Sequence, residues 1–126
     1  MSEYTSAEFD EARRILREAA DLIETRGWAR FMFETSEGEH CTLGAIRQSA
    51  DGSIYETRKS AAATSLVAKE LRDRGFKGDA ERDYSWVTDD EYRREAENFD
   101  LVTDWNDADE RAAEEVVRLL REAGRG

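Results

Sequence analysis

His40 and Cys41 are the residues whose types best suit catalysis, because a cysteine paired with a histidine can act as a nucleophile. The two are adjacent, however, and neighbouring side chains on an extended segment point to opposite faces. A working Cys–His pair must also be oriented by a third group. We therefore expect a buried structural cysteine and a partly exposed histidine at these positions.

Metal binding would need a richer set of ligands. One histidine and one cysteine supply only two of the roughly four ligands of a zinc site. Asp104, Asn106 and Asp109 are spaced like the start of a calcium-binding loop. Ala108 occupies the fifth position of that pattern, however, and both its glycine and its final glutamate are missing. We predict no metal site and no cofactor, and we expect these polar residues to cap a helix.

The negative charge of the chain is concentrated in one segment. The net charge is −11, and residues 79–110 hold thirteen acids against three arginines, so the remainder is close to neutral. This balance argues against direct nucleic-acid binding, which needs a basic surface. The segment is either a solvated surface that maintains solubility or an acidic face that docks on a basic partner protein. Its candidate contact residues are Tyr84, Trp86, Asp89, Asp90, Glu91, Tyr92 and Glu95.

The spacing of apolar residues predicts a mainly α-helical fold, a compact bundle of about four to five helices. Capping boxes at Thr5–Glu8 and Thr88–Glu91 mark two of the helix starts. Alternating apolar residues and a turn sequence favour a possible short β-hairpin near residues 29–42. The helices are expected at about residues 7–26, 43–50, 57–74, 88–98 and 111–123.

The last helix and the turn before it have the clearest pattern. Asp107 and Glu110 are spaced as a capping box, and either Asn106 or Asp107 suits the N-cap position. Trp105 directly precedes them, where a large apolar residue can staple a helix start to the core. We predict that this turn begins the final helix.

Length and cysteine content favour a single domain over residues 1–126 in the cytoplasm. A chain of 126 residues can bury a core without a metal or disulfide. The single cysteine permits no internal disulfide, which suits a reducing compartment. No stretch approaches the roughly 18 apolar residues of a membrane span, and the N-terminus lacks the features of a signal peptide.

Several short motifs together resemble an uncharacterised small domain family of actinobacteria and their phages. They are Gly27-Trp28, a turn at Gly38, Cys41-Thr42-Leu43-Gly44-Ala45, Trp105-Asn106-Asp107, Glu115-Val116 and Leu119-Leu120. The resemblance implies a small, mainly helical domain of unknown function and brings no known catalytic residues. Two features depart from it: Ala112 stands where threonine is expected, and the acidic stretch of residues 79–100 is longer than expected.

We therefore predict that the protein binds a basic partner protein through residues 79–110 and that it is not a catalyst. The alternative is an enzyme or small-ligand-binding protein, which would show polar groups converging in a pocket. The residues of that possible pocket are Trp28, His40, Cys41, Trp105, Asn106 and Asp107. The oligomeric state stays open.

Overall fold

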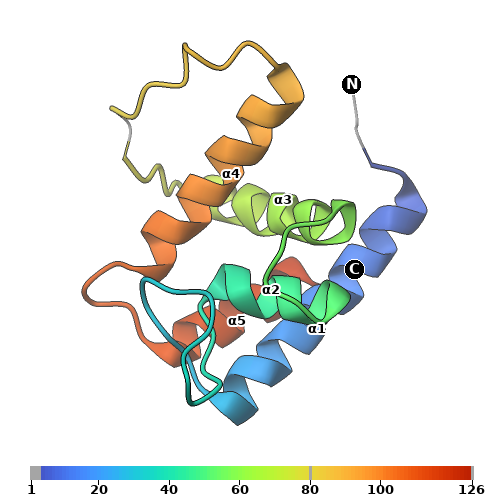
Figure 1. The fold of residues 1–126 in the computed structure, drawn as a ribbon, viewed down its shortest axis with the longest axis vertical. Coiled ribbons are helices and arrows are strands. Elements are labelled where there is room, and N and C mark those ends of the chain that lie inside the picture. Colours follow the sequence, from blue (N-terminus) through green and yellow to red (C-terminus); the bar gives the residue numbers. More distant parts are fainter. Residues whose placement is uncertain (1–3, 80, 126) are drawn as a thin grey trace.

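Five helices form the part of the chain that the computed structural model describes, residues 4–79 and 81–125. The helices pack into a compact, mainly helical bundle, as the sequence predicts, and the described residues form no strand (Figure 1). None of these helices is both long enough and apolar enough to cross a membrane. In chain order they are α1 (Ser6–Arg26), α2 (Thr42–Asp51), α3 (Arg58–Asp73), α4 (Asp90–Asn106) and α5 (Ala113–Ala123).

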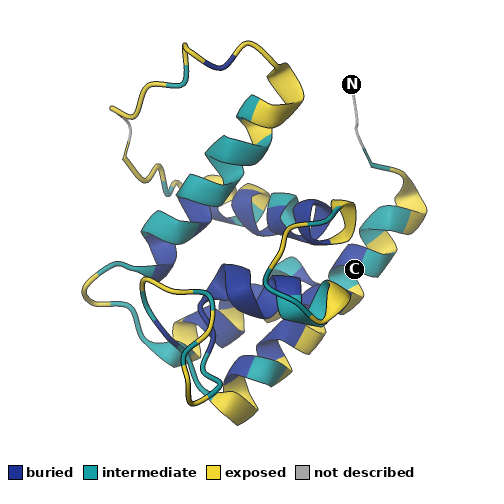
Figure 2. Cartoon of the chain, viewed as in Figure 1, coloured by how far each residue is buried: buried dark blue, intermediate teal, exposed yellow. Residues whose placement is uncertain are grey.

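The core lies where α1 packs against α2, α3 and α5. Apolar residues at helical spacing, such as Leu16 of α1 and Leu120 of α5, are completely buried there. The C-terminal part of α4 joins this core through Leu101, Val102 and Trp105. The other end of α4 and the loop before it extend away from the bundle and are mostly exposed (Figures 1 and 2).

Helix α1 has the ends that its sequence predicts. Glu8 N–H donates to Thr5 Oγ1 (3.1 Å), and Thr5 N–H donates to Glu8 Oε1 (2.8 Å), which completes the capping box. Gly27 N–H closes the helix on Ile23 O at a φ of 105°, a conformation that favours glycine. These contacts fix where the next segment, residues 27–41, leaves α1.

The possible β-hairpin near residues 29–42 does not form as paired strands. The turn around residues 36–38 is present, but only isolated bridges link His40 to Trp28 and to Glu34. A regular ladder cannot continue because Phe31 adopts a positive φ of 68° and donates its N–H to Asp107 Oδ1 (3.0 Å). The segment is a folded loop tied to the end of α4.

The predicted boundary between the last two helices is wrong. Helix α4 begins at Asp90 with Asp89, not Thr88, as its N-cap: Tyr92 N–H donates to Asp89 Oδ1 (2.8 Å). It then continues to Asn106 rather than ending near Asn98. The continuation buries Leu101, Val102 and Trp105. The free energy gained by burying these side chains exceeds the preference of the local sequence for a turn.

The N-cap of α5 is Ala112, neither Asn106 nor Asp107. Half of a capping box is present, because Ala112 N–H donates to Glu115 Oε1 (2.8 Å). The other half is missing because alanine has no side-chain acceptor. Ala112 is also the position at which the family resemblance predicts a threonine, whose hydroxyl would complete the capping box.

Candidate functional site

Asn106, at the end of α4, is the centre of a buried polar network. Its Oδ1 accepts hydrogen bonds from Trp28 Nε1 (2.8 Å), Thr42 N (2.9 Å) and Thr42 Oγ1 (2.6 Å). Its Nδ2 donates to Ala29 O (3.1 Å) and to Asp107 Oδ1 (2.9 Å). Every hydrogen-bonding group of this 2 % exposed amide is therefore used within the protein.

This network accounts for three of the predicted pocket residues, Trp28, Asn106 and Asp107. Polar groups do converge here, as the alternative hypothesis requires, but they bond to one another. Asp107 Oδ1 additionally accepts the backbone N–H of Phe31. The network thereby fixes the loop of residues 27–41 against the start of α2 and the end of α4.

Cys41 is buried, as predicted, and is the N-cap of α2. Its Sγ accepts a hydrogen bond from Gly44 N (3.3 Å). Burial raises the pKa of the Cys41 thiol above its usual value, although the hydrogen bond from Gly44 opposes this rise. The thiol is therefore held in its protonated, less nucleophilic form at neutral pH.

His40 and Trp105 are also buried, and the expected partial exposure of His40 is wrong. The His40 side chain is enclosed because its backbone bonds to residues 27 and 29 on either side of Trp28. Neither ring nitrogen has a hydrogen-bond partner in the described part of the chain, and Nε2 lies 3.9 Å from Glu34 Oε2. Trp105 packs in the core beneath the guanidinium of Arg111, 3.9 Å from the ring centroid.

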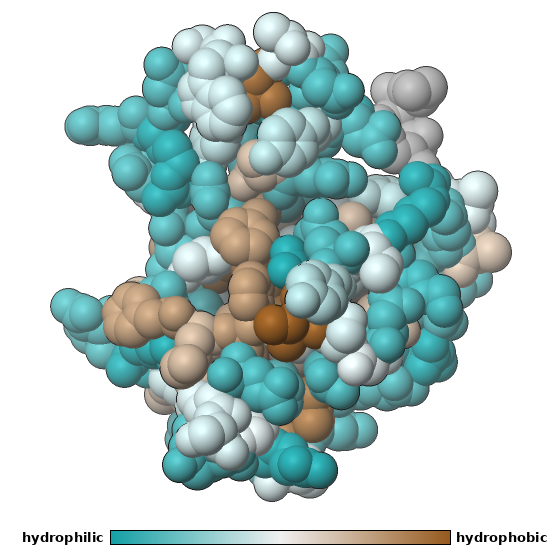
Figure 3. Space-filling view, viewed as in Figure 1, coloured by the Kyte–Doolittle hydropathy of each residue, from teal (hydrophilic) through white to brown (hydrophobic). Residues whose placement is uncertain are grey.

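An apolar hollow of about 440 Å³ lies beside this network. Figure 3 shows apolar surface gathered across the middle of the face of the molecule that is turned toward the viewer. The predicted pocket contributes only part of its wall, and sequence reasoning missed the aromatic remainder, for which the run Phe31-Met32-Phe33 was the available signal. The lining residues are Phe31, Met32, Phe33, Cys41, Leu43, Phe99, Thr103, Asn106 and Asp107.

Phe31 stands out within this hollow. It is 76 % exposed, and Met32 beside it is 51 % exposed. Phe31 is also the one non-glycine residue with a positive φ among those described. Such a backbone costs of order 1–3 kcal/mol for a bulky residue and persists only where the surrounding structure enforces it. The fold thus maintains a strained backbone at a residue whose aromatic side chain is largely exposed.

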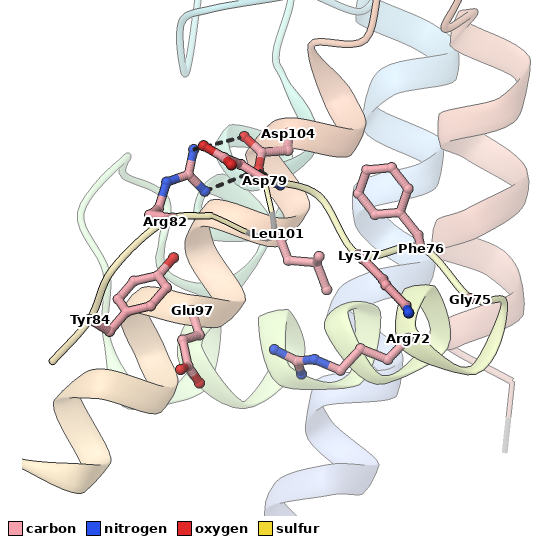
Figure 4. Close-up of a pocket in the computed structure, with 10 residues that line it drawn as sticks. All are labelled: Arg72, Gly75, Phe76, Lys77, Asp79, Arg82, Tyr84, Glu97, Leu101 and Asp104. Carbon is pink, nitrogen blue, oxygen red and sulfur yellow. Dashed lines mark hydrogen bonds and ion pairs between the residues drawn. The ribbon is translucent and has the colours of Figure 1, made fainter.

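The acidic segment divides into a structural part and an exposed part. Arg82 donates to both oxygens of Asp104 (3.0 and 3.3 Å), and Tyr84 OH donates to Asp100 Oδ2 (2.5 Å). Figure 4 shows Arg82, Tyr84 and Asp104 among the residues around a hollow of about 510 Å³ between the end of α3, the following loop and α4. Asp100 and Asp104 therefore hold the loop against α4.

The exposed part surrounds the start of α4. Trp86 is 71 % exposed and Tyr92 is 56 % exposed. Trp86 Nε1 donates to Asp83 O (3.1 Å), which restricts the indole. Among the other predicted contact residues, Asp89, Asp90 and Glu91 are exposed, whereas Tyr84 and Glu95 are partly buried.

Several carboxylates lie close enough to repel one another in this exposed part of the segment. Burial is the largest cause that raises the pKa of Glu95. Neighbouring carboxylates raise it further, in the order Glu56, Glu91 and Asp89. The pKa of Tyr4 rises to about 12, through burial first and then through Glu95. In both cases the neighbouring carboxylates add to the larger effect of burial, and Arg58 opposes them.

Comparison with known proteins identifies the family but no characterised relative. No curated protein and no solved structure matches the chain. A model of a family of unknown function, DUF6197, matches residues 9–125, which is nearly the whole chain. The match spans all the motifs discussed above, from Gly27-Trp28 to Leu119-Leu120. The chain therefore belongs to the DUF6197 family.

Proposed function

We propose that this chain is a small acidic binding protein that docks on a basic partner protein through residues exposed around the start of α4. Its setting is the cytoplasm of an actinobacterium or of a cell infected by one of its phages. The proposed contact surface is smaller than the predicted segment of residues 79–110, because Asp100 and Asp104 hold the loop before α4 in place. The remaining candidate residues, here called the acidic face, are the exposed Trp86, Asp89, Asp90, Glu91 and Tyr92 together with the partly buried Tyr84 and Glu95.

The clustering of carboxylates around Glu95 is the observation that carries this proposal. Beyond the effect of burial, Glu56, Glu91 and Asp89 each raise the pKa of Glu95, and this repulsion is opposed by Arg58. A partner that brings lysine or arginine side chains to this face relieves that repulsion. The same field attracts a basic partner over long range and speeds encounter.

Trp86 and Tyr92 supply the apolar part of such an interface. Tryptophan and tyrosine are enriched among the residues that dominate binding energy. Both side chains are more than half exposed, so each has apolar area left to bury in a complex. The bond from Trp86 to Asp83 O holds the indole before binding, which reduces the entropy lost on docking.

Charge reversal tests the proposal once partners are captured from an actinobacterial lysate and identified by mass spectrometry. The variant Asp90→Lys/Glu91→Lys leaves Asp89 in place, because Asp89 caps α4. The matched control, Glu37→Lys/Glu114→Lys, changes the net charge equally at exposed sites outside the face. Association of each variant with the captured partner is followed by stopped-flow fluorescence at several salt concentrations.

We expect the first variant to associate about tenfold more slowly at low salt and to lose most of its salt dependence. The control variant should keep most of the wild-type rate. Equal rates for both variants, or a wild-type rate indifferent to salt, would refute docking through the acidic face.

A further inference from the structure

We infer that the apolar hollow beside Phe31 receives an apolar side chain from an amphipathic, basic helical segment of the same partner. This inference rests on the proposed function and adds an anchor site to it. The hollow is here called the anchor hollow, and its rim is formed by the exposed Phe31 and Met32 and the partly buried Asp107.

The first observation is the construction of the rim. The Asp107 carboxylate holds the backbone of Phe31 in a left-handed conformation, and Asn106 in turn holds Asp107. A bulky residue rarely holds this backbone unless surrounding contacts enforce it. Here the polar network enforces it while the phenyl ring stays 76 % exposed, as expected for a contact residue in the unbound state.

The second observation is the aromatic wall of the same hollow. Phe33 and Phe99 pack edge to face with ring centroids 6.2 Å apart. The guanidinium of Arg47 covers both rings, 4.7 Å and 5.4 Å from their centroids. Arg47 is itself fixed by Ile54 O (3.0 Å) and Glu56 (3.3 Å). A preformed apolar hollow of this kind suits a single large aliphatic or aromatic side chain.

Charge decides which occupant fits. Exposed Glu34 follows the wall residue Phe33, Asp107 lies on the rim, and exposed Asp109 and Glu110 follow it in the chain. The nearby bases already have partners: Arg47 is paired with Glu56 and Arg111 with Glu115, and Arg30 donates to the backbone carbonyls of residues 109 and 111. A second copy of this chain, with its own net charge of −11, would bring like charges together. A segment carrying lysine or arginine complements the same rim.

The anchor hollow and the acidic face both include residues of α4. Tyr92 and Phe99 are seven residues apart, so they share one side of the helix at a separation of about 10 Å. Tyr92 belongs to the acidic face, and Phe99 lines the anchor hollow. A partner helix of three turns, about 16 Å long, can therefore contact both.

Three model helices of about 18 residues, roughly 27 Å long, serve as probes. The first carries lysine on one side and leucine on the other. The second replaces leucine with serine, and the third replaces lysine with glutamate. Binding is measured by fluorescence anisotropy against wild type, Phe31→Asn, Phe31→Tyr and Asp90→Lys/Glu91→Lys. Asparagine tolerates the left-handed backbone but removes the aromatic ring, whereas tyrosine keeps the ring.

We expect wild type to bind the Lys/Leu helix about tenfold or more tightly than the Lys/Ser helix, because only leucine fills the hollow. Phe31→Asn should lose most of this advantage without lowering the thermal midpoint of unfolding, and Phe31→Tyr should retain it. A structural role for Phe31 predicts the opposite pattern, in which stability falls with affinity.

The outcomes separate this inference from the proposed function. If charge reversal weakens both lysine helices but Phe31→Asn changes nothing, the acidic face stands and the anchor hollow is refuted. If Phe31→Asn matters and charge reversal does not, the acidic face is refuted. Equal affinity for the Lys/Leu and Lys/Ser helices, or tight binding of the Glu/Leu helix, overturns the inference.

Discussion

Replacing Asn106 with alanine removes the centre of the network that positions the loop of residues 27–41. The change leaves the Trp28 indole N–H, the Thr42 backbone N–H and the Ala29 carbonyl without partners. Each buried polar group left unpaired costs about 1–3 kcal/mol. Water entering from the adjacent hollow offsets part of this cost, so we expect a loss of about 3–5 kcal/mol. That is a large share of the roughly 5–15 kcal/mol typical of a domain.

Urea unfolding followed by circular dichroism measures this loss, with Asn98→Ala as the control on the same helix. Asn98 is partly exposed and outside the network, so its replacement should cost less than about 1 kcal/mol. Trp28→Phe supplies the second arm of a double-mutant cycle. It should cost clearly less in the Asn106→Ala background, where its acceptor is already gone. A loss below about 1 kcal/mol for Asn106→Ala, or strict additivity in the cycle, would refute the network.

Three further predictions follow from local geometry. Ala112→Thr should raise the unfolding free energy by about 0.5–2 kcal/mol by completing the capping box with Glu115, and an unchanged midpoint in thermal unfolding would contradict this. Gly44→Ala should destabilise the fold by more than about 2 kcal/mol in urea titration, because a Cβ there would lie 2.0 Å from Phe33 O; wild-type stability would show that the loop can move away. Cys41 should react slowly with a thiol reagent at neutral pH, since burial raises its pKa, and faster as the pH rises toward that pKa; rapid labelling of the native protein at pH 7 would disprove this protection.

The helices that could be predicted are those specified by local pattern. Both ends of α1 follow from residues within one turn of them, Thr5 and Glu8 at the start and Gly27 at the end. The start of α5 could not be placed in this way, because its N-cap is an alanine with no capping side chain. The polar sequence Asn106-Asp107 resembles an N-cap more closely than the sequence around Ala112 does.

The continuation of α4 depends on tertiary contacts. Leu101 and Val102 read as a short connection, although no glycine or proline interrupts the helix at that point. Their burial, together with that of Trp105, extends the helix by two turns beyond the expected end. Hydrophobic contacts with distant helices supply that stabilisation, and no window of neighbouring residues contains it.

The candidate site also has features that composition predicts and features that depend on tertiary contacts. The acidic character of residues 79–110 could be read from composition, whereas the use of Asp104 by Arg82 could not. The outward position of Phe31 depends on Asp107, which is 76 residues away in the chain. The burial of His40 likewise depends on how the loop folds back on the end of α1.

Chemical-shift mapping with the Lys/Leu helix tests the central claim most directly. Amide resonances of ¹⁵N-labelled protein are followed during titration at low and at high salt. The account predicts shifts concentrated in residues 84–95 and 31–33, with an affinity that falls as salt rises. Shifts confined to the outer faces of α1 and α5, or an affinity unaffected by salt, would contradict it.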